Sequence, residues 1–157
     1  AGFSHYEISN FARPGCESRH NLAYWQWRDH LGLGAGAHGF GHEHGQGIGT
    51  GTPGFRYMNL RDPDAYMSAP RGAWVESSER LTREMATSEF VMLGLRMLAG
   101  FEEKAFEETF GVELKDAMTS LGYLVRRGFL ERDGGRVRLT RRGLMLADSV
   151  LPRLAAA

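Results

Sequence analysis

The 157-residue sequence contains one cysteine, no net charge and no long hydrophobic run. Cys16 by itself excludes an internal disulfide, and it cannot hold a zinc or iron–sulfur site alone. The 19 basic and 19 acidic residues balance, which argues against nucleic acid as a partner. No apolar stretch approaches the roughly 20 residues of a membrane span. With no signal-like opening, these absences predict a cytoplasmic protein without a span, and they leave peripheral membrane contact open.

Regular structure is scarce in the first half. Residues 32–54 hold 10 glycines, which predicts a loop with at most one short strand. Before it, residues 5–11 predict one strand, and residues 16–31 predict a short helix or an irregular loop. Residues 55–83 predict a connector with one short helix near 62–67.

The second half has helical periodicity. Thr82 is the predicted N-cap of a helix over residues 83–99, which Gly100 ends. A shorter helix is predicted over 102–110, and the apolar spacing predicts another over 114–125.

A hairpin and a last helix follow. The turn is predicted at Asp133-Gly134-Gly135, with Val137 and Leu139 facing in and Arg136 and Arg138 facing out. Thr140 is the predicted cap of the last helix, whose apolar stripe comprises Leu144, Ala147, Leu151 and Leu154. This order of elements resembles a winged helix.

The run RHNLAYWQW at residues 19–27 combines an imidazole with three large rings. His20 is a suitable ligand for iron, and on a helix it shares a face with Tyr24. Trp25 and Trp27 offer flat apolar area for a macrocycle. The alternative is that the rings are core and His20 is a hydrogen-bonded structural residue.

The run GLGAGAHGF at residues 32–40 is a second candidate. Small residues allow close approach of a ligand, and successive amides can form an anion-binding nest. Gly34, Gly36 and Gly39 nearly match a dinucleotide-binding pattern, although no helix is predicted to follow. Turn chemistry explains these glycines equally well.

Two further clusters carry alternatives. His38, His42 and His44 have spacings that suit Zn²⁺ or Ni²⁺, or they are plain loop residues. Seven arginines gather near the hairpin, as a phosphate-contacting wing, a solvated face or a lid packed on another domain. They are Arg126, Arg127, Arg132, Arg136, Arg138, Arg141 and Arg142.

Taken together, HYEISNFARPG, SRHNLAYW and GLGAGAHGF resemble the radical S-adenosylmethionine (SAM) proteins of the HemN/HemW family. This family comprises oxygen-independent coproporphyrinogen III oxidases and a haem-chaperone branch, and HNLAYW is similar to the latter. FRYMN, with Arg56 and Asn59, resembles the family's R-x-x-N element. LGLRMLAGF, FGVEL and LTRRGLMLADSVL resemble its C-terminal domain.

The resemblance implies an α+β fold. The chain would be the C-terminal piece of a partial α/β (TIM-like) radical SAM barrel followed by a helical, winged-helix-like domain. Residues 1–54 would end the barrel, residues 55–80 would connect, and residues 81–157 would form the HemN-type C-terminal domain. The missing N-terminal barrel half would be a partner of this fragment.

The resemblance also implies site residues. The HNxxYW motif, associated with haem binding in the chaperone branch, falls on His20, Asn21, Tyr24 and Trp25, with His20 as axial ligand of the haem iron. Arg19 is suited to pair with a haem propionate. The segment Gly34, Ala35, Gly36 and Ala37, with His38 beside it, would lie near S-adenosylmethionine once the barrel is complete.

One departure limits the chemistry of this chain. The family's CxxxCxxC motif is absent, so the chain is not an active enzyme by itself, and S-adenosylmethionine and a four-iron four-sulfur cluster are expected only in the full-length protein. The predicted function is that of a fragment of a haem chaperone, which binds haem and delivers it to apo-proteins. The alternatives are a coproporphyrinogen III oxidase, a winged-helix nucleic-acid-binding module and a histidine-loop metal binder.

Overall fold

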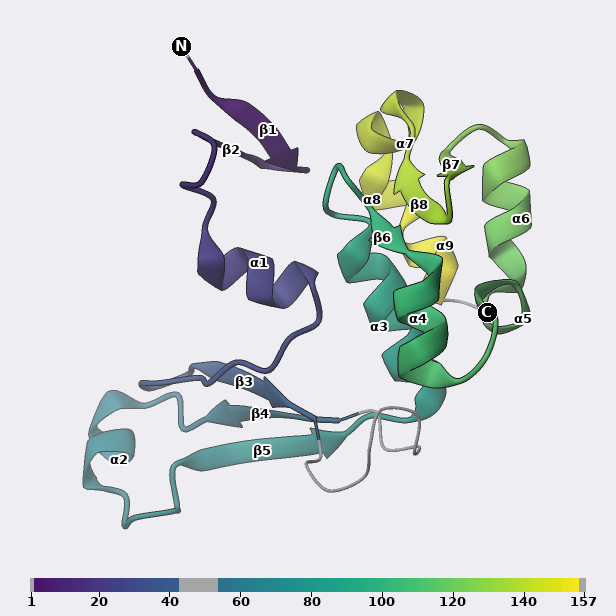
Figure 1. Cartoon of the computed structure of the whole chain (residues 1–157). Coiled ribbons are helices and arrows are strands. Elements are labelled where there is room, and N and C mark those ends of the chain that lie inside the picture. Colours follow the sequence, from purple (N-terminus) through teal and green to yellow (C-terminus); the bar gives the residue numbers. More distant parts are fainter. Residues whose placement is uncertain (1, 43–53, 156–157) are drawn as a thin grey trace. The chain divides into compact units, whose positions relative to one another are not determined.

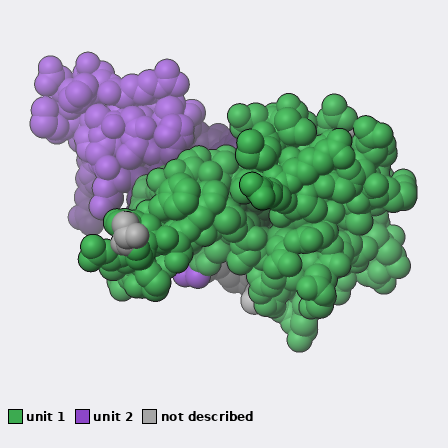
Figure 2. Space-filling view, turned by 90° about the horizontal axis from the view of Figure 1, so that it is seen from above, with its two compact units in different colours: residues 1–27, 87–157 green, residues 28–86 purple. Residues whose placement is uncertain are grey.

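The computed structural model describes residues 2–42 and 54–155 (Figure 1). Contacts divide the chain into unit 1, residues 1–27 and 87–157, and unit 2, residues 28–86 (Figure 2). These units reflect contact density, and the sequence-based division at residues 54 and 80 stays a prediction. Within the described ranges, no helix has the length and hydrophobicity that crossing a bilayer requires.

Unit 1 begins with a hairpin of β1 (Ser4–Glu7) and β2 (Asn10–Ala12), which pair antiparallel. The prediction of a single strand over residues 5–11 is therefore wrong. The chain reverses because Glu7 Oε1 accepts hydrogen bonds from the Ser9 amide, at 3.1 Å, and from Asn10 Nδ2. A side chain that bonds its own backbone two residues on stabilises a tight turn.

Helix α3 (Arg83–Gly94) is shorter than predicted. Thr82 caps it as expected, since its Oγ1 accepts from the Met85 amide at 3.2 Å. The following residues pair with the hairpin instead of continuing the helix. The Ile8 amide donates to Arg96 O at 3.0 Å, and the Leu98 amide donates to Tyr6 O at 3.1 Å. Tertiary pairing thus overrides helix propensity here.

The rest of unit 1 has the predicted order of helices around a small antiparallel sheet, β6-β8-β7. The hairpin prediction is confirmed, with Val137 and Leu139 buried and their arginine neighbours half-exposed. The helix predicted over 114–125 breaks at Met118, whose φ is −128°. The elements are β6 (Phe101–Glu102), α4 (Glu103–Phe110), α5 (Leu114–Ala117), α6 (Thr119–Arg126), β7 (Leu130–Asp133) and β8 (Arg136–Leu139).

Three short helices, α7 (Arg141–Met145), α8 (Ala147–Val150) and α9 (Pro152–Ala155), replace the predicted last helix. Thr140 caps α7 as predicted, because its hydroxyl accepts from the Gly143 amide at 3.0 Å. Three of the four stripe residues are buried, and the fourth is half-buried. The buried residues are Ala147, Leu151 and Leu154, which join a core that includes Phe106, Leu121, Leu124 and Leu130.

Unit 2 contains the antiparallel sheet β3-β4-β5, formed by β3 (His38–Gly41), β4 (Phe55–Asn59) and β5 (Val75–Arg80). The connector prediction missed both β4 and β5. Helix α2 (Pro63–Ser68) confirms the predicted short helix, and Asp62 caps it by accepting from the Ala65 amide at 2.7 Å.

The α+β class is confirmed. Every strand pair in residues 2–42 and 54–155 is antiparallel. The described part of the chain therefore holds no parallel ladder of the kind that builds a TIM-like barrel.

Candidate functional site

Helix α1 (Arg19–Trp25) carries the ring cluster of unit 1. Its start is fixed by Ser18, whose Oγ accepts from the Asn21 amide at 3.3 Å. The Ser18 amide also lies 3.4 Å from Tyr6 Oη, which ties the helix to the hairpin. The helix ends before Trp27, a residue with a φ of 51°. A side chain that bulky in the left-handed region is held there by its surroundings.

The His20 side chain is exposed on α1. Its ring meets Tyr24 edge-on, with ring centroids 4.9 Å apart and an interplanar angle of 77°, so the predicted shared face is observed. No hydrogen bond to the His20 ring is recorded among residues 2–42 and 54–155. An exposed imidazole with an edge contact leaves its ring nitrogens accessible to a ligand.

The aromatic residues of this run have two different roles. Tyr24 and Trp25 are half-buried. Trp27 is 6% exposed and lies against Phe90 and Phe110, at centroid distances of 5.9 and 5.4 Å. Trp27 is therefore a core residue that anchors the end of α1, whereas the other two rings remain partly accessible.

Sequence reasoning missed the pair beside Trp25, a buried glutamate and a half-buried arginine. Glu7 is fully buried, and its Oε2 lies 4.0 Å from Arg96 Nη2. The Arg96 guanidinium covers the Trp25 ring at 4.4 Å from its centroid. The one available signal was the charged residue Glu7 within the strand predicted over residues 5–11.

In unit 2 the glycine loop is organised by three polar side chains. Asn59, only 4% exposed, donates from Nδ2 to both Gly32 O and Gly34 O at 3.0 Å. Tyr57 Oη accepts from the Gly32 amide at 3.1 Å, and Tyr66 Oη accepts from the Gly34 amide at 3.2 Å. The loop therefore has a fixed path.

Two more amides of the loop are engaged. Gly36 donates to Leu60 O at 2.8 Å, and Ala37 donates to Gly34 O at 3.3 Å. These donors are not available for the anion nest that the glycine pattern suggested. Strand β3 follows the loop where a dinucleotide-binding motif requires a helix. The loop still presents small residues, since Ala35 is exposed and its neighbours are half-buried.

The histidine cluster is only partly described. His38 is exposed, His42 Nδ1 contacts Asp29 Oδ1, and His44 lies outside the described residues. In the described ranges, no three histidine, cysteine, aspartate or glutamate side chains form a potential metal site.

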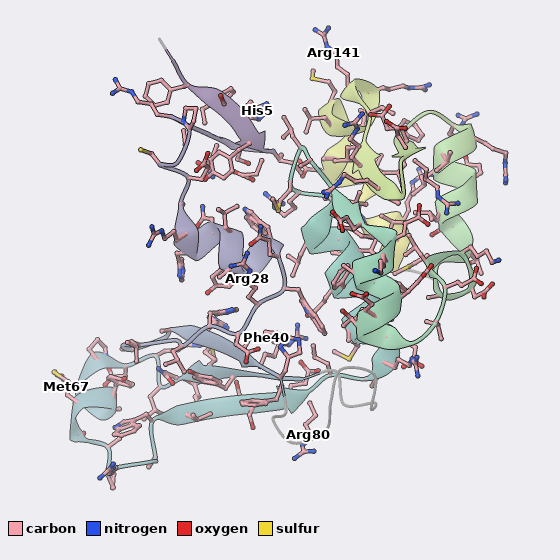
Figure 3. All side chains as sticks on the ribbon, viewed as in Figure 1. His5, Arg28, Phe40, Met67, Arg80 and Arg141 are labelled. Atoms are coloured by element: carbon pink, nitrogen blue, oxygen red, sulfur yellow. The ribbon has the colours of Figure 1, made fainter. Side chains whose placement is uncertain are left out.

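Three of the seven arginines near the hairpin are paired with glutamates. Arg132 binds Glu103, Arg136 binds Glu102 and Arg138 binds Glu131. The hydrogen bond with Glu103 raises the pKa of Arg132 above its usual range. Figure 3 shows Arg141 extending away from the start of α7. Three of the seven arginines are thus neutralised locally, which weakens the phosphate-contacting wing.

The two predicted sets of site residues lie in different units. His20, Asn21, Tyr24 and Trp25 are brought together on α1 in unit 1, while residues 34–38 belong to unit 2. The chain has no side chains that fit an iron–sulfur cluster, because Cys16 is its single cysteine and is exposed.

Residues 81–146 match the model of the HemN C-terminal domain. The chain is 31% identical over 160 residues to the heme chaperone HemW of Lactococcus lactis, covering 97% of the chain and 38% of that protein. It is 36% identical to heme chaperone HemW of Bacillus subtilis, covering 95% and 37%. It is 35% identical to heme chaperone HemW of Mycobacterium tuberculosis H37Rv, and the match covers 98% of the chain and 35% of that protein.

Coproporphyrinogen III oxidase (HemN) from Escherichia coli, a radical SAM enzyme, has a similar fold. The TM-score is 0.64 at 16% identity, over 98% of this chain and 37% of that one. The chain thus spans little more than a third of the length of the relatives it matches. Sequence and fold agree that it belongs to the HemN/HemW family of radical SAM proteins, with residues 81–146 as its HemN C-terminal domain.

Proposed function

We propose that the complete protein is a haem chaperone that binds haem and delivers it to apo-proteins, and that α1 supplies its grip on the porphyrin. The observation that carries the proposal is the exposed His20 imidazole beside Tyr24 and Trp25 on a capped helix. It is supported by the names of the relatives, which are called heme chaperones.

Each residue has a definite part. An imidazole ligates iron through either ring nitrogen, so His20 would hold the haem iron. Tyr24 restrains that ring by its edge contact. Trp25 offers the porphyrin only the indole face that Arg96 does not cover. Asn21 lies next to the ligand, and the exposed Arg19 pairs with a propionate.

The remaining cofactors lie with the rest of the protein. S-adenosylmethionine and the four-iron four-sulfur cluster supply radical chemistry when bound, and the cluster ligands come from a region that precedes this chain. Gly34, Ala35, Gly36, Ala37 and His38 border the S-adenosylmethionine site. The small residues there permit close approach, and Asn59 fixes their path. We place the protein in the cytoplasm.

The test is a hemin titration of the full-length protein followed by its Soret band. His20→Ala should weaken the band and lower affinity by roughly tenfold or more, as loss of an iron ligand implies. His5→Ala is the matched control, because the His5 ring stacks on Phe11 at 4.3 Å in the hairpin and belongs to no proposed site. An unchanged titration of His20→Ala would remove His20 from the site.

The alternative function is the oxidative decarboxylation of coproporphyrinogen III, and the similarity in fold to HemN supports it. Anaerobic assay of the reconstituted full-length protein with coproporphyrinogen III distinguishes the two. A chaperone should release no carbon dioxide from that substrate, whereas turnover would make the oxidase the better description.

A further inference from the structure

Glu7 is a buried titratable group to which the haem site as proposed assigns no role. Its Oε1 alone satisfies the hairpin turn, through the Ser9 amide and Asn10 Nδ2. Its Oε2 is buried without a hydrogen-bond partner. Removing a carboxyl oxygen from water without a hydrogen-bond partner destabilises a fold. The turn therefore does not explain why a carboxylate occupies this position.

The second oxygen faces a cation that is itself incompletely paired. Arg96 Nη2 lies 4.0 Å from Glu7 Oε2, and Arg96 Nε is buried without a hydrogen-bond partner. The backbone brings the two side chains together, because the Ile8 amide donates to Arg96 O and Glu7 forms an isolated antiparallel β-bridge with Met97. Attraction at this distance orients the guanidinium without a direct hydrogen bond.

The oriented guanidinium covers the indole of Trp25, 4.4 Å from its centroid. A cation over an indole face is an attractive contact whose energy depends on alignment. The Trp25 Nε1 donor is also buried without a partner, so no hydrogen bond fixes the ring plane. The contact with Arg96 is thus the polar interaction that sets how Trp25 lies on α1.

We propose that Glu7 and Arg96 are positioning residues: the buried carboxylate holds the guanidinium, and the guanidinium holds the Trp25 indole with one face open to the porphyrin. This inference rests on the proposed haem site and adds two residues to it from outside the HNxxYW motif. Neither residue touches haem. They act on haem affinity only through Trp25.

The test uses the full-length protein and three variants. Glu7→Gln keeps an acceptor oxygen for the turn and removes the charge. Arg96→Met keeps most of the apolar stem and removes the cation, whereas Arg96→Lys retains the charge without the planar group. Glu102→Gln is the matched control, because it breaks the exposed pair with Arg136 elsewhere in unit 1.

The first measurement needs no haem. The indole N–H signal of Trp25 is assigned by its loss in Trp25→Phe, and its hydrogen exchange is followed by NMR. Glu7→Gln and Arg96→Met should shift this signal and speed its exchange by roughly tenfold, as expected for loss of one cation–π contact. Arg96→Lys should restore part of the protection, and Glu102→Gln should change neither quantity.

The second measurement is the rate of haem release and the position of the Soret band. Glu7→Gln and Arg96→Met should release haem about tenfold faster, with unchanged far-UV circular dichroism, which is the low end of the effect typical of residues that orient a metal site without touching it. An unmoved Trp25 signal in both variants overturns the positioning role. A moved signal with unchanged haem release overturns its link to haem.

Failure of the underlying haem site is separately visible. If His20→Ala and Trp25→Phe both leave the hemin titration unchanged, the proposed function fails whatever the other variants do. The NMR measurement then still decides whether Glu7 and Arg96 hold Trp25. If Glu7→Gln loses the far-UV signal of the fold, Arg96→Met and Arg96→Lys decide the question.

Discussion

The α1 segment, residues 18–27, and the glycine loop, residues 32–37, are both rich in residues that suggest ligand binding, yet they treat their polar groups in opposite ways. In the loop, four of the backbone amides donate to acceptors within unit 2. On α1, the His20 ring is exposed and the Trp25 indole nitrogen has no partner.

The two segments can therefore contribute different things to a binding site. The loop can offer a ligand close approach to small residues, because its own hydrogen bonds fix its path. The α1 segment offers a metal ligand and aromatic surface, because the His20 side chain is exposed and Trp25 is only half-buried. A glycine pattern therefore says little about free donors until its acceptors are known.

The largest expected effect tests whether Trp27 serves the core while Trp25 remains available to a ligand. Trp27→Ala should lower the free energy of unfolding by about 3–5 kcal/mol, because it empties space between Phe90 and Phe110. Trp25→Ala should cost clearly less, since Trp25 is only half-buried. Urea unfolding measures both. Equal losses would show that both indoles serve mainly as core.

The next effect tests how tightly strand β3 packs against Tyr57, whose hydroxyl accepts a hydrogen bond from the Gly32 amide of the loop. A Cβ on Gly39 would lie 2.2 Å from the Tyr57 ring, so Gly39→Ala should destabilise the protein by about 1–3 kcal/mol. Gly122→Ala is the control. Its Cβ would contact only Arg126 Nη1, at 3.5 Å. Because glycine destabilises a helix interior relative to alanine, Gly122→Ala should raise the free energy of unfolding by about 0.5–1 kcal/mol. Thermal unfolding compares them, and a neutral Gly39→Ala would mean that Tyr57 moves aside freely.

The smallest effect sharpens the role of α1 as a presenting element. Ser18→Ala removes the acceptor for the Asn21 amide and should cost about 1 kcal/mol. Thr140→Ala removes the equivalent cap of α7 and should cost a similar amount. Only Ser18→Ala should also weaken hemin binding, measured by Soret titration. Equal hemin affinity in the two variants would show that hemin binding does not depend on the N-cap of α1.

Local chemistry made several elements predictable. Ser, Thr and Asp caps identify helix starts because their side chains satisfy amides within three residues, as at Thr82 and Thr140. The turn at Asp133-Gly134-Gly135 was predictable because tight hairpin turns require positive φ, which glycine adopts at low cost. Both glycines have positive φ in the structure. Strand β5 was not, because all of its residues are exposed and it lacks an alternating apolar pattern.

The candidate site divides in the same way. The contact of His20 with Tyr24 follows from helical spacing once the segment forms a helix, whereas the sequence left open whether His20 is exposed. Trp27 could not be separated from Trp25 by spacing, because its burial depends on Phe90 and Phe110, more than 60 residues away in the chain. The loop was predicted as glycine-rich, but its acceptors, Tyr57 and Tyr66, come from β4 and α2.

The amino-acid sequence by itself determined the family, the caps, the C-terminal hairpin and the face shared by His20 and Tyr24, because each depends on residues close together in the chain. Only the tertiary structure decided that Glu7 is buried, that Arg96 covers Trp25 and that four of the loop amides are engaged. Those outcomes depend on which distant segments pair. Pairing of residues 6–8 with 96–98 both ended α3 early and placed the carboxylate beside the guanidinium.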